Sequence, residues 1–239
     1  MYTINKMKVV ILAGGKGTRL RPLTLSIPKP LIPIGDTPIL EILIKKLKKQ
    51  GLKDIILSVG YKSDLIINYF GNGKKFGVKI NYFKEKKIMG TAACLKVIKS
   101  KFKIKKPILV LNGDIFTEIN YKKMISSHKE NKADVTVGLK EKEIKVKYGV
   151  YDIKNKKIER IREKPTIKIN ASIGINIFNH DIIDLIPKNK FYDIPDLINK
   201  SLKLKKKVFA YNVNEFWMAV DHIIDLEEAN VIIKKMKKK

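Results

Sequence analysis

The sequence predicts an α/β fold, a three-layer sandwich in which helices cover both faces of a mostly parallel, mixed sheet. In the first half of the chain, short apolar runs alternate with amphipathic segments. This β-α-β-α order favours parallel strands joined by helical crossovers. No linker, internal repeat or low-complexity segment divides the 239 residues. We therefore expect one domain, residues 1–239, which is long enough to bury a substantial core.

The first half supplies the parallel part of the predicted sheet. Four short apolar runs are typical of buried strands: Val9–Leu12, Ile55–Val59, Val78–Phe83 and Ile108–Leu111. Three segments between them are typical of helices: Ile39–Gln50, Asp64–Phe70 and Thr91–Lys99. Gly51 fits the end of the first helix. The pattern predicts strands that all run in one direction.

The alternation of strand-like and helical segments ends after Asp114, where strand-like runs become more frequent. The expected strands are Asp134–Leu139, Tyr148–Ile153, Ile158–Glu163, Ser172–Phe178 and Val208–Val213. The expected helices are Tyr121–Asn131, Asp181–Ile186, Ile194–Lys203 and Ile224–Met236. The stretch DIKNKK at 152–157 predicts a hairpin turn.

The formal net charge of +28 would ordinarily indicate a nucleic-acid or anionic-membrane surface. Nearly all of this charge is lysine, spread along the chain without a visible stripe, and Ile and Asn are abundant too. AT-rich codons favour such a composition, so we expect no specific nucleic-acid partner. A nucleic-acid-binding protein that uses this fold is the alternative, and it predicts tight, steeply salt-dependent binding.

The same composition bears on location and metal chemistry. No apolar run is long enough to span a membrane, and the start MYTINKMKVV lacks the apolar stretch of a signal peptide. We therefore expect a cytoplasmic protein without a membrane span. The single cysteine, Cys94, excludes an intrachain disulfide, and the three scattered histidines lack the spacing of a zinc site.

A glycine-rich loop follows the first predicted strand, at its carboxyl end, where open α/β sheets bind ligands. It contains Gly14, Gly15 and Gly17, and it is followed by Arg19 and Lys29. The stretch matches neither a P-loop nor a dinucleotide fingerprint. Glycines let backbone N–H groups approach phosphate, and the two cations can bind its oxygens. A tight turn with solvated cations explains the residues equally well, so both interpretations stay open.

Two other positions invite a chemical interpretation. Asp114 comes just after the run Ile108–Leu111, and a carboxylate at a strand end is a natural Mg²⁺ ligand or an ordinary turn residue. Cys94 falls early in a predicted helix, where a thiolate is favoured, but we expect an ordinary core thiol.

The order of residues LAGGKGTRLRPLT…PKPLIPIGDTPILE, from Leu12 onward, resembles the N-terminal signature of the sugar-1-phosphate nucleotidyltransferases, or NDP-sugar pyrophosphorylases. The similarity continues at MGTAACL (89–95), LNGDIF (111–116), YGV (148–150), EKP (163–165) and FW…LEEAN (216–230), so it covers nearly the whole chain. The second half resembles most the short bacterial mannose-1-phosphate guanylyltransferase-like members. The resemblance implies a Rossmann-like sheet of the nucleotide-diphospho-sugar transferase type.

The resemblance also implies an activity. In this family an oxygen of a sugar 1-phosphate attacks the α-phosphorus of an NTP in line, pyrophosphate leaves, and an NDP-sugar forms with the help of Mg²⁺. GTP is the NTP that we favour. A nucleotide-binding half at about 1–116 and a sugar-binding half at about 117–239, which closes the site, are implied. A homodimer is a further family-level expectation.

The implied roles fall on residues that match the family's motifs. Arg19 would hold the triphosphate, Lys29 would lie beside the α-phosphate, and Asp114 would bind Mg²⁺ with Asn112 next to it. Thr91 could also cap the following helix, and the two roles are compatible. The nucleotide-binding set is Leu12, Ala13, Gly14, Gly15, Gly17, Thr18, Glu85, Gly90, Thr91 and Asn112. The sugar-phosphate-binding set is Gly149, Glu163, Lys164 and Asn170.

The last motif departs from the family. Its pattern W-x-D-I-G carries a second metal-binding Asp, but FWMAVDH places Ala219 at that Asp and Asp221 at the Gly. Ser172 and Gly174 likewise stand where the family favours Gly and Tyr. Three interpretations follow. In the first, Asp221 replaces the lost ligand after a loop rearrangement; in the second, Asp114 holds Mg²⁺ alone, with weaker activity. In the third, the chain is a non-catalytic paralogue. We expect an enzyme, because the other substrate-facing motifs are in place.

Overall fold

The central element of the computed structural model is a seven-stranded sheet with the order β12-β8-β11-β6-β1-β4-β5. The structure describes residues 7–85, 87 and 89–237. The strands are β1 (Lys8–Ala13), β4 (Asp54–Val59), β5 (Lys79–Lys84), β6 (Ile108–Asn112), β8 (Val135–Lys145), β11 (Thr166–Phe178) and β12 (Val208–Asn212). Only β11 runs against the others in this sheet. The predicted mostly parallel, mixed sheet is thus confirmed.

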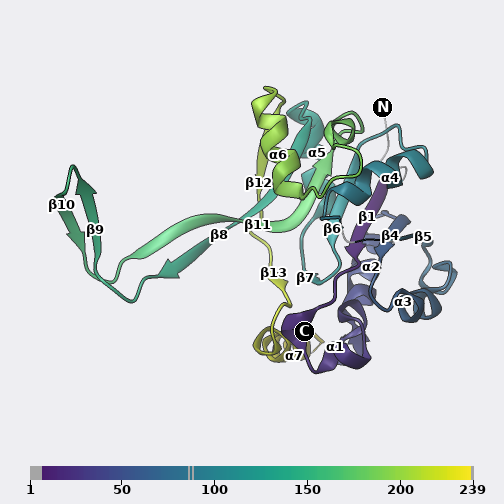
Figure 1. Cartoon of the computed structure of the whole chain (residues 1–239). Coiled ribbons are helices and arrows are strands. Elements are labelled where there is room, and N and C mark those ends of the chain that lie inside the picture. Colours follow the sequence, from purple (N-terminus) through teal and green to yellow (C-terminus); the bar gives the residue numbers. More distant parts are fainter. Residues whose placement is uncertain (1–6, 86, 88, 238–239) are drawn as a thin grey trace.

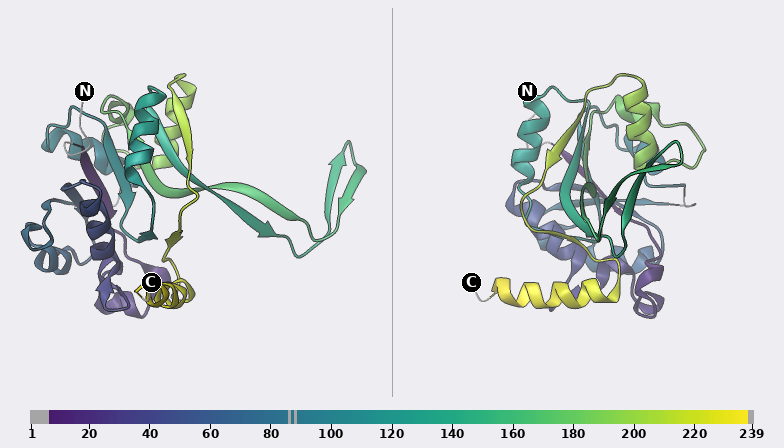
Figure 2. Two further views of the ribbon diagram at one scale, coloured as in Figure 1. Left: turned by 180° about the vertical axis from the view of Figure 1, so that it is seen from behind. Right: turned by 90° about the vertical axis from the view of Figure 1, so that its left-hand side faces the viewer.

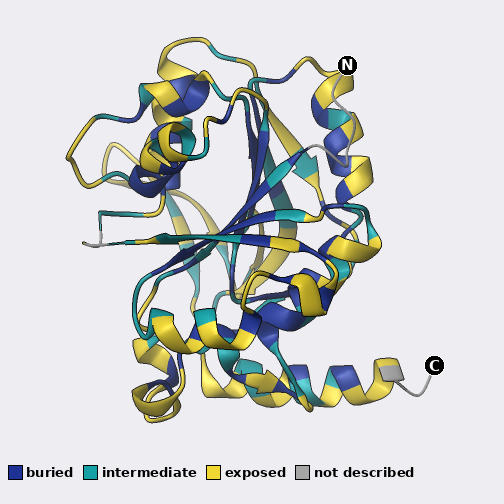
Figure 3. Ribbon diagram, turned by 90° about the vertical axis from the view of Figure 1, so that its right-hand side faces the viewer, coloured by how far each residue is buried: buried dark blue, intermediate teal, exposed yellow. Residues whose placement is uncertain are grey.

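Helices cover both faces of this sheet, as predicted (Figure 1). On one face lie α2 (Ile39–Lys49), α3 (Ser63–Phe70) and α5 (Tyr121–Glu130), which share a buried apolar cluster with β1, β4 and β6. On the other face, α4 (Ala93–Lys101) and α6 (Ile194–Lys203) share a second cluster. The strands between them are mostly buried (Figure 3). The three-layer sandwich therefore follows from apolar residues on both faces of the parallel strands.

A third cluster joins the two ends of the chain. α7 (Ile223–Lys237) contributes Ala229 and Ile233, which pack with Leu20, Ile32 and Ile34 from the segment after β1. That segment contains the short elements η2 (Thr18–Leu20), α1 (Leu23–Ser26), η3 (Lys29–Leu31), β2 (Pro33–Ile34) and β3 (Thr37–Pro38). Figure 2 shows α7 as a separate yellow helix along the edge of the body, beside this purple segment. The contact fixes the loop that follows β1.

Two short strands bring the carboxyl end of the chain to the sheet. β7 (Ile115–Thr117) follows β6 directly and pairs with β13 (Trp217–Ala219), so that Ile115 lies opposite Ala219. The remaining short elements are η4 (Lys74–Phe76) and η5 (Ile182–Leu185), the second of which replaces the helix expected at Asp181–Ile186. The pairing of β7 with β13 places the residues after β13 next to those after β6.

A long ribbon leaves the body where β8 and β11 continue beyond the sheet (Figures 1 and 2). We call residues 140–171 the arm. Its stem is the paired outer parts of β8 and β11, and its tip is the hairpin β9 (Val150–Lys154) and β10 (Lys157–Arg162). The hairpin turn expected at 152–157 is confirmed, with Asn155 and Lys156 at φ of 46° and 68°.

The two stem strands are longer than the runs predicted at Asp134–Leu139 and Ser172–Phe178. Their outer parts, 140–145 and 166–171, are rich in Lys and Glu, which are uncommon in strands. Backbone pairing of Ile144 with Ile167 and of Lys142 with Ile169 holds them together nonetheless. The tertiary ladder overrides the local preference. The arm consequently extends away from the body, while the rest of the second half, with β12 and α6, belongs to it; that the second half closes the site stays a prediction.

A buried histidine on α5 gives the fold a pH dependence. The ring of His128 contacts the Thr136 hydroxyl at 2.7 Å through Nδ1 and Asn179 Oδ1 at 3.2 Å through Nε2. Burial lowers the pKa of His128 below its ordinary value, and Asn179 and Asp134 oppose this only in part. The unfolded chain therefore binds a proton more readily, so folded stability is complete above about pH 6.5 and falls as the pH drops toward the folded-state pKa.

We expect the change His128→Gln to flatten this pH dependence. Glutamine does not titrate, so the fall in melting temperature between pH 7.5 and 5 (about the range in which His titrates) will be smaller than in the wild type. Thermal unfolding followed by circular dichroism measures this fall in melting temperature. His180→Gln is the matched control and will keep the wild-type slope. Equal slopes for wild type and His128→Gln would contradict the assignment.

Candidate active site

A pocket of about 480 Å³ opens at the carboxyl ends of β1 and β6. Parallel pairing brings these strand ends together, with Leu12 opposite Asn112. Every residue that the sequence assigned to the nucleotide, together with Arg19, Lys29, Asp114 and Asp221, lines it. The full lining is Leu12, Ala13, Gly14, Gly15, Gly17, Thr18, Arg19, Lys29, Pro30, Glu85, Gly90, Thr91, Cys94, Asn112, Gly113, Asp114, Phe191, Asp193 and Asp221.

The glycine loop is held close to its neighbours. A Cβ on Gly14 would lie 2.9 Å from Glu85 Oε1, and Gly17 has a φ of 60° with Lys29 Cβ 3.0 Å from where its own Cβ would be. The Thr24 hydroxyl donates to the Gly17 carbonyl at 2.9 Å. Larger residues would strain or displace this backbone. The loop therefore keeps its backbone groups at the pocket wall.

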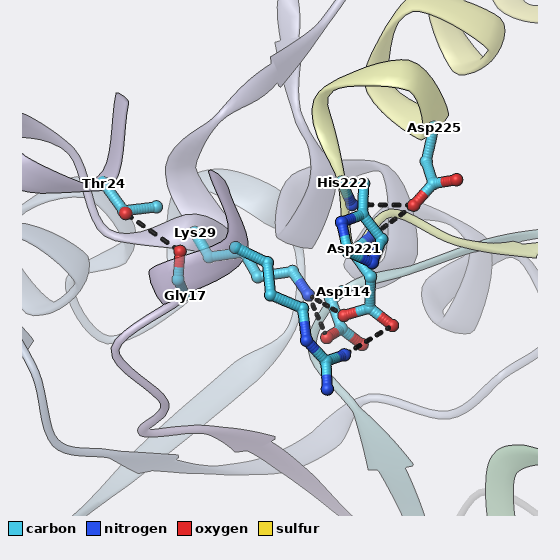
Figure 4. A network of polar contacts seen from close by, with 8 residues as sticks. Gly17, Thr24, Lys29, Asp114, Asp221, His222 and Asp225 are labelled. Carbon is cyan, nitrogen blue, oxygen red and sulfur yellow. Dashed lines mark hydrogen bonds and ion pairs between the residues drawn. The ribbon is translucent and has the colours of Figure 1, made fainter. Parts of the chain in front are cut away.

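Lys29 is the centre of the charged network shown in Figure 4. Its Nζ lies 2.6 Å from Asp114 Oδ2 and 2.7 Å from Asp221 Oδ1, and its side chain is only 11% exposed. Arg19 Nη1 lies 3.8 Å from Asp221 Oδ2 on the open side. One ammonium thus joins two carboxylates that are 107 residues apart in the chain (Asp114 and Asp221).

Asp221 is fixed and ionised. Its backbone N–H and that of His222 donate to Asp225 Oδ2 at 2.9 and 2.7 Å, at the start of α7. Burial opposes ionisation of Asp221, but the hydrogen bond and charge of Lys29, with the charge of Arg19, hold the pKa of its carboxyl below the ordinary value. The carboxylate is charged when Lys29 is beside it.

The position of Asp221 is relevant to Ala219, which stands where the family has its second metal-binding Asp. Ala219 lies within β13, paired with Ile115, while Asp221 stands two residues later beside Asp114. The Val220 N–H donates to the Asp114 carbonyl at 3.1 Å, which holds the two chain segments together. No loop rearrangement is needed to bring a second carboxylate to Asp114.

Glu85 and Cys94 form the deeper wall. The Ser58 hydroxyl donates to Glu85 Oε1 at 2.7 Å, and burial raises the pKa of Glu85 above its usual value despite this hydrogen bond. Burial, with the nearby Glu85, raises the pKa of the Cys94 thiol to about 12. Cys94 is therefore protonated and only 6% exposed, which confirms the interpretation as a core thiol.

The loop at Gly90 and Thr91 is tied to α6. Gly90 has a φ of +94°, and a Cβ there would lie 2.6 Å from the Tyr192 carbonyl oxygen, so glycine is required. Thr91 N–H and Oγ1 donate to Asp193 Oδ1 at 2.7 and 2.9 Å, and the Ile194 N–H donates to Thr91 Oγ1 at 2.9 Å. α4 begins only at Ala93 after an N-cap at Ala92, so the expectation that Thr91 caps this helix is wrong.

Asp193 and Phe191 are pocket residues that the sequence did not single out. Asp193 precedes Ile194–Lys203 with Asp196 three residues later, which is a helix-start pattern. Nothing in that pattern indicates Thr91, which lies 102 residues away. The sequence pattern therefore indicated Asp193 as a helix cap, but not as a pocket residue.

A second hollow of about 550 Å³ adjoins the first and shares Thr91, Asn112 and Asp193 with it. Its other wall includes Ser172 and Gly174, the two positions where this chain departs from the family pattern. Gly174 has a φ of +68°, and a Cβ there would lie 2.6 Å from Asn112 Nδ2. The two hollows are thus neighbours that share part of their walls.

The four residues predicted to bind the sugar phosphate lie elsewhere. Gly149, Glu163, Lys164 and Asn170 are on the arm, and neither hollow is lined by them. A Cβ on Gly149 would lie 3.1 Å from Glu163 Oε2, so the first two are neighbours. Their role toward a sugar phosphate stays a prediction.

The carboxylates fit a magnesium ion. Asp114 and Asp221 already share one cation, the Lys29 ammonium, which shows that they can face a common positive charge. Within the part of the chain that the structure describes, no group of three or more His, Cys, Asp or Glu side chains is placed to hold a metal. Mg²⁺ usually takes one or two carboxylates and completes its shell with water and substrate phosphates.

A glycine loop and clustered charges at the carboxyl edge of an α/β sheet lie where sheets of this kind bind ligands. The nucleotidyl transferase family matches this chain over residues 8–236, and the chain belongs to that family. In the described residues, no helix is long and apolar enough to cross a membrane.

Curated relatives agree with this assignment. A mannose-1-phosphate guanyltransferase from Yarrowia lipolytica is 35% identical over 226 residues, covering 90% of this chain and 60% of that protein. A UTP–glucose-1-phosphate uridylyltransferase from Synechocystis is 33% identical over 241 residues, covering 93% and 62%. The chain thus spans about three fifths of the length of these relatives.

Solved structures show the same fold. A putative glucose-1-phosphate thymidylyltransferase from Bacillus anthracis superposes with a TM-score of 0.77 at 27% identity, covering 95% of this chain and 94% of that one. HddC from Yersinia pseudotuberculosis, in complex with GMP-PN, gives 0.73 at 30% identity, covering 95% and 99%. Guanylyl, uridylyl and thymidylyl names all occur, so the relatives share the reaction class and differ in the base.

Proposed function

We propose that this protein transfers a nucleoside monophosphate from an NTP to a sugar 1-phosphate, with release of pyrophosphate. The observation that carries the proposal is the network of Arg19, Lys29, Asp114 and Asp221 beside the glycine loop. Two anionic substrates must be brought together in this reaction, and positioning with charge neutralisation supplies most of its catalysis. A cleft with both signs of charge at one edge fits that task.

The two adjoining hollows suggest separate binding sites for the two substrates. The first, walled by the glycine loop, Glu85 and Thr91, would take the base, ribose and phosphates. The second, walled by Ser172 and Gly174, would take the sugar. The sugar 1-phosphate oxygen would then approach the α-phosphorus near Asn112, a residue shared by both hollows.

The reaction itself is an in-line displacement. A phosphate oxygen of the sugar 1-phosphate forms a bond to the α-phosphorus, and the bond from that phosphorus to the bridging oxygen breaks, with its electron pair leaving on pyrophosphate. Lys29 neutralises charge on the α-phosphate oxygens, and Arg19 holds the leaving pyrophosphate with its planar fork of donors. Magnesium held by Asp114 and Asp221 would supply further charge neutralisation at the phosphates.

We propose GTP as the nucleotide, because a guanyltransferase and a structure with GMP-PN are among the similar proteins. Magnesium dependence is proposed from the carboxylate pair. The cytoplasm, where nucleoside triphosphates are made, is the proposed location. No feature of the described cleft favours a protein without turnover.

Pyrophosphate release tests the proposal directly. The protein is incubated with each common NTP, Mg²⁺ and mannose, glucose or glucosamine 1-phosphate, and release is followed by a coupled assay. We expect turnover with GTP and a hexose 1-phosphate, and none after chelation of the metal. The same panel read by thermal shift identifies ligands that bind the folded state. Binding of an NTP without turnover for any sugar would overturn the enzymatic proposal.

A further inference from the structure

A buried amide in the central sheet carries a polar atom without a partner. Asn176 is 1% exposed, and its side-chain oxygen Oδ1 makes no hydrogen bond within the described part of the chain. The residue lies inside β11, where its backbone is opposite Val110 of β6 and Val137 of β8. A buried polar atom that lacks a partner destabilises the folded state, so its presence calls for an explanation.

The packing around Asn176 does not explain the amide. Side chains alternate along a strand, and Ile175 and Ile177 belong to the apolar cluster shared with α2 and α5. Asn176 therefore points to the opposite face, where Phe178 and Val110 belong to the cluster shared with α4 and α6. Leucine, which branches in the same way as asparagine, would suit such apolar surroundings without an unpaired oxygen.

Asn176 lines the second hollow, and the other residues there indicate what that hollow can bind. Val137 of β8 and Ile194 of α6 line it too, so apolar carbon lies beside the amide. The chain has 51 Lys and Arg residues, yet none in the described ranges lines this hollow, whereas Asp193 does. An anion placed there would meet a carboxylate and no cation. The second hollow therefore suits an uncharged group.

Gly174 holds the wall that the two hollows share. It lies two residues before Asn176 and lines the same hollow. A Cβ at Gly174 would come within 2.6 Å of Asn112 Nδ2, so a larger residue would displace Asn112. Asn112 lines both hollows, and Asn176 lines only the second. A ligand that spans the shared wall would thus place one end beside the cations of the first hollow and its other end at Asn176.

A hydroxyl is the group that best fits this amide. The side chain of asparagine has an oxygen that accepts and an NH₂ that donates, and a half-turn about its last bond exchanges the two. Either group of Asn176 can therefore face the hollow. A hydroxyl both donates and accepts, so it can pair with either one. A sugar combines such hydroxyls with ring carbons that can pack against the apolar wall.

We propose that Asn176 binds a hydroxyl of the sugar 1-phosphate and selects uncharged hexoses that carry this hydroxyl. This role rests on the proposed function, in which the second hollow takes the sugar. The hydroxyl is one remote from the phosphate-bearing C1, at C3, C4 or C6, because Asn176 does not line the first hollow. A sugar that lacks it leaves the buried amide unpaired, and a sugar with a carboxylate meets Asp193.

Deoxy sugars test this role through a double-mutant cycle. Pyrophosphate release is measured with the hexose 1-phosphate that turns over and with its 3-, 4- and 6-deoxy analogues. For wild type, kcat/KM is expected to be about 30-fold lower with one analogue, the cost of one unpaired buried group. Asn176→Leu is expected to lose about as much with the parent sugar and to treat parent and analogue alike. A wild type indifferent to all three analogues, or a variant with the wild-type preference, would overturn the proposal.

Two comparisons support the reading of this cycle. Asn212→Leu, the same change at an exposed position of β12 outside both hollows, is expected to keep the wild-type kcat/KM. The melting temperature of Asn176→Leu should match or exceed that of wild type, because the change removes an unpaired polar atom. If the leucine variant does not fold, Asn176→Ala removes the amide without adding volume and is read in the same way.

The charge of the ligand is tested with the uronic acid of the same sugar. This 1-phosphate carries a carboxylate at C6, and wild type is expected to turn it over at least 30-fold more slowly than the parent hexose, since no described cation lines the second hollow. Equal kcat/KM for the two sugars would refute selection for an uncharged group.

Binding measured without turnover separates this inference from the proposed function. Protein saturated with a non-reactive GTP analogue is titrated with the hexose 1-phosphate in a calorimeter, and Asn176→Leu is expected to bind about 30-fold more weakly than wild type. Such a difference in a protein that releases no pyrophosphate would support the site and refute the reaction. Turnover with equal binding by wild type and variant would refute the role of Asn176 and leave the reaction standing. Neither binding nor turnover would refute both.

Discussion

Replacing Lys29 by methionine is expected to lower kcat/KM for pyrophosphate release by about 10³-fold, the range seen when a charge-stabilising donor is removed from an active site. The Lys29 side chain is 11% exposed and its Nζ lies 2.6 and 2.7 Å from two carboxylates, whereas Arg19 approaches only Asp221, at 3.8 Å. Because the charge develops in the transition state, kcat should fall more than KM rises. Steady-state kinetics with GTP and a hexose 1-phosphate measures both.

Lys16→Met is the matched control for this change. Lys16 belongs to the nearby glycine loop but does not line the pocket, so its variant should keep nearly wild-type turnover. Circular dichroism must show that both variants fold. A Lys29→Met enzyme within tenfold of wild type (about 1.4 kcal/mol) would rule out the role given to this residue.

The change Asp221→Asn is expected to reduce turnover about 100-fold and to raise the magnesium concentration needed for half-maximal rate. Its carboxylate faces Asp114 through Lys29, and amide oxygen is a poorer magnesium ligand than carboxylate. A magnesium titration of pyrophosphate release at fixed substrate gives both quantities. Asp184→Asn, at an exposed carboxylate paired with Lys99, is the control.

Adding Ala219→Asp to the Asp221→Asn variant distinguishes the two positions. Ala219 is held in β13 by pairing with Ile115, whereas Asp221 begins the turn into α7. We expect no rescue of turnover, because the second carboxylate of this chain stands at position 221, two residues after position 219. Recovery of wild-type turnover in the double variant would show that position 219 is the functional one after all.

The body of the fold was predictable because its signals are local. Apolar runs such as Ile55–Val59 and the helical stripe through Leu40 and Leu47 are properties of a few adjacent residues, and burial in the structure follows them. The order of these elements also predicted where the pocket lies. Parallel strands end at one edge, so the loop after β1 and Asp114 after β6 had to meet there.

The structural features that the sequence did not predict depend on contacts between distant segments. The stem strands extend through charged residues that have no strand preference, and only their pairing with each other reveals them. The contact of Thr91 with Asp193 joins residues 102 positions apart, and no periodicity reports it. The same holds for Asp221, whose neighbour Lys29 is 192 positions away.

The packing of α7 against the segment after β1 has a consequence for biosynthesis. Leu20, Ile32 and Ile34 share their cluster with Ala229 and Ile233, which come much later in the sequence. The parallel strands β1, β4, β5 and β6 can pack with the helices between them during translation, because all of them precede α7 in the chain. A nascent chain can therefore order its parallel strands before the segment after β1 acquires the helix against which it packs.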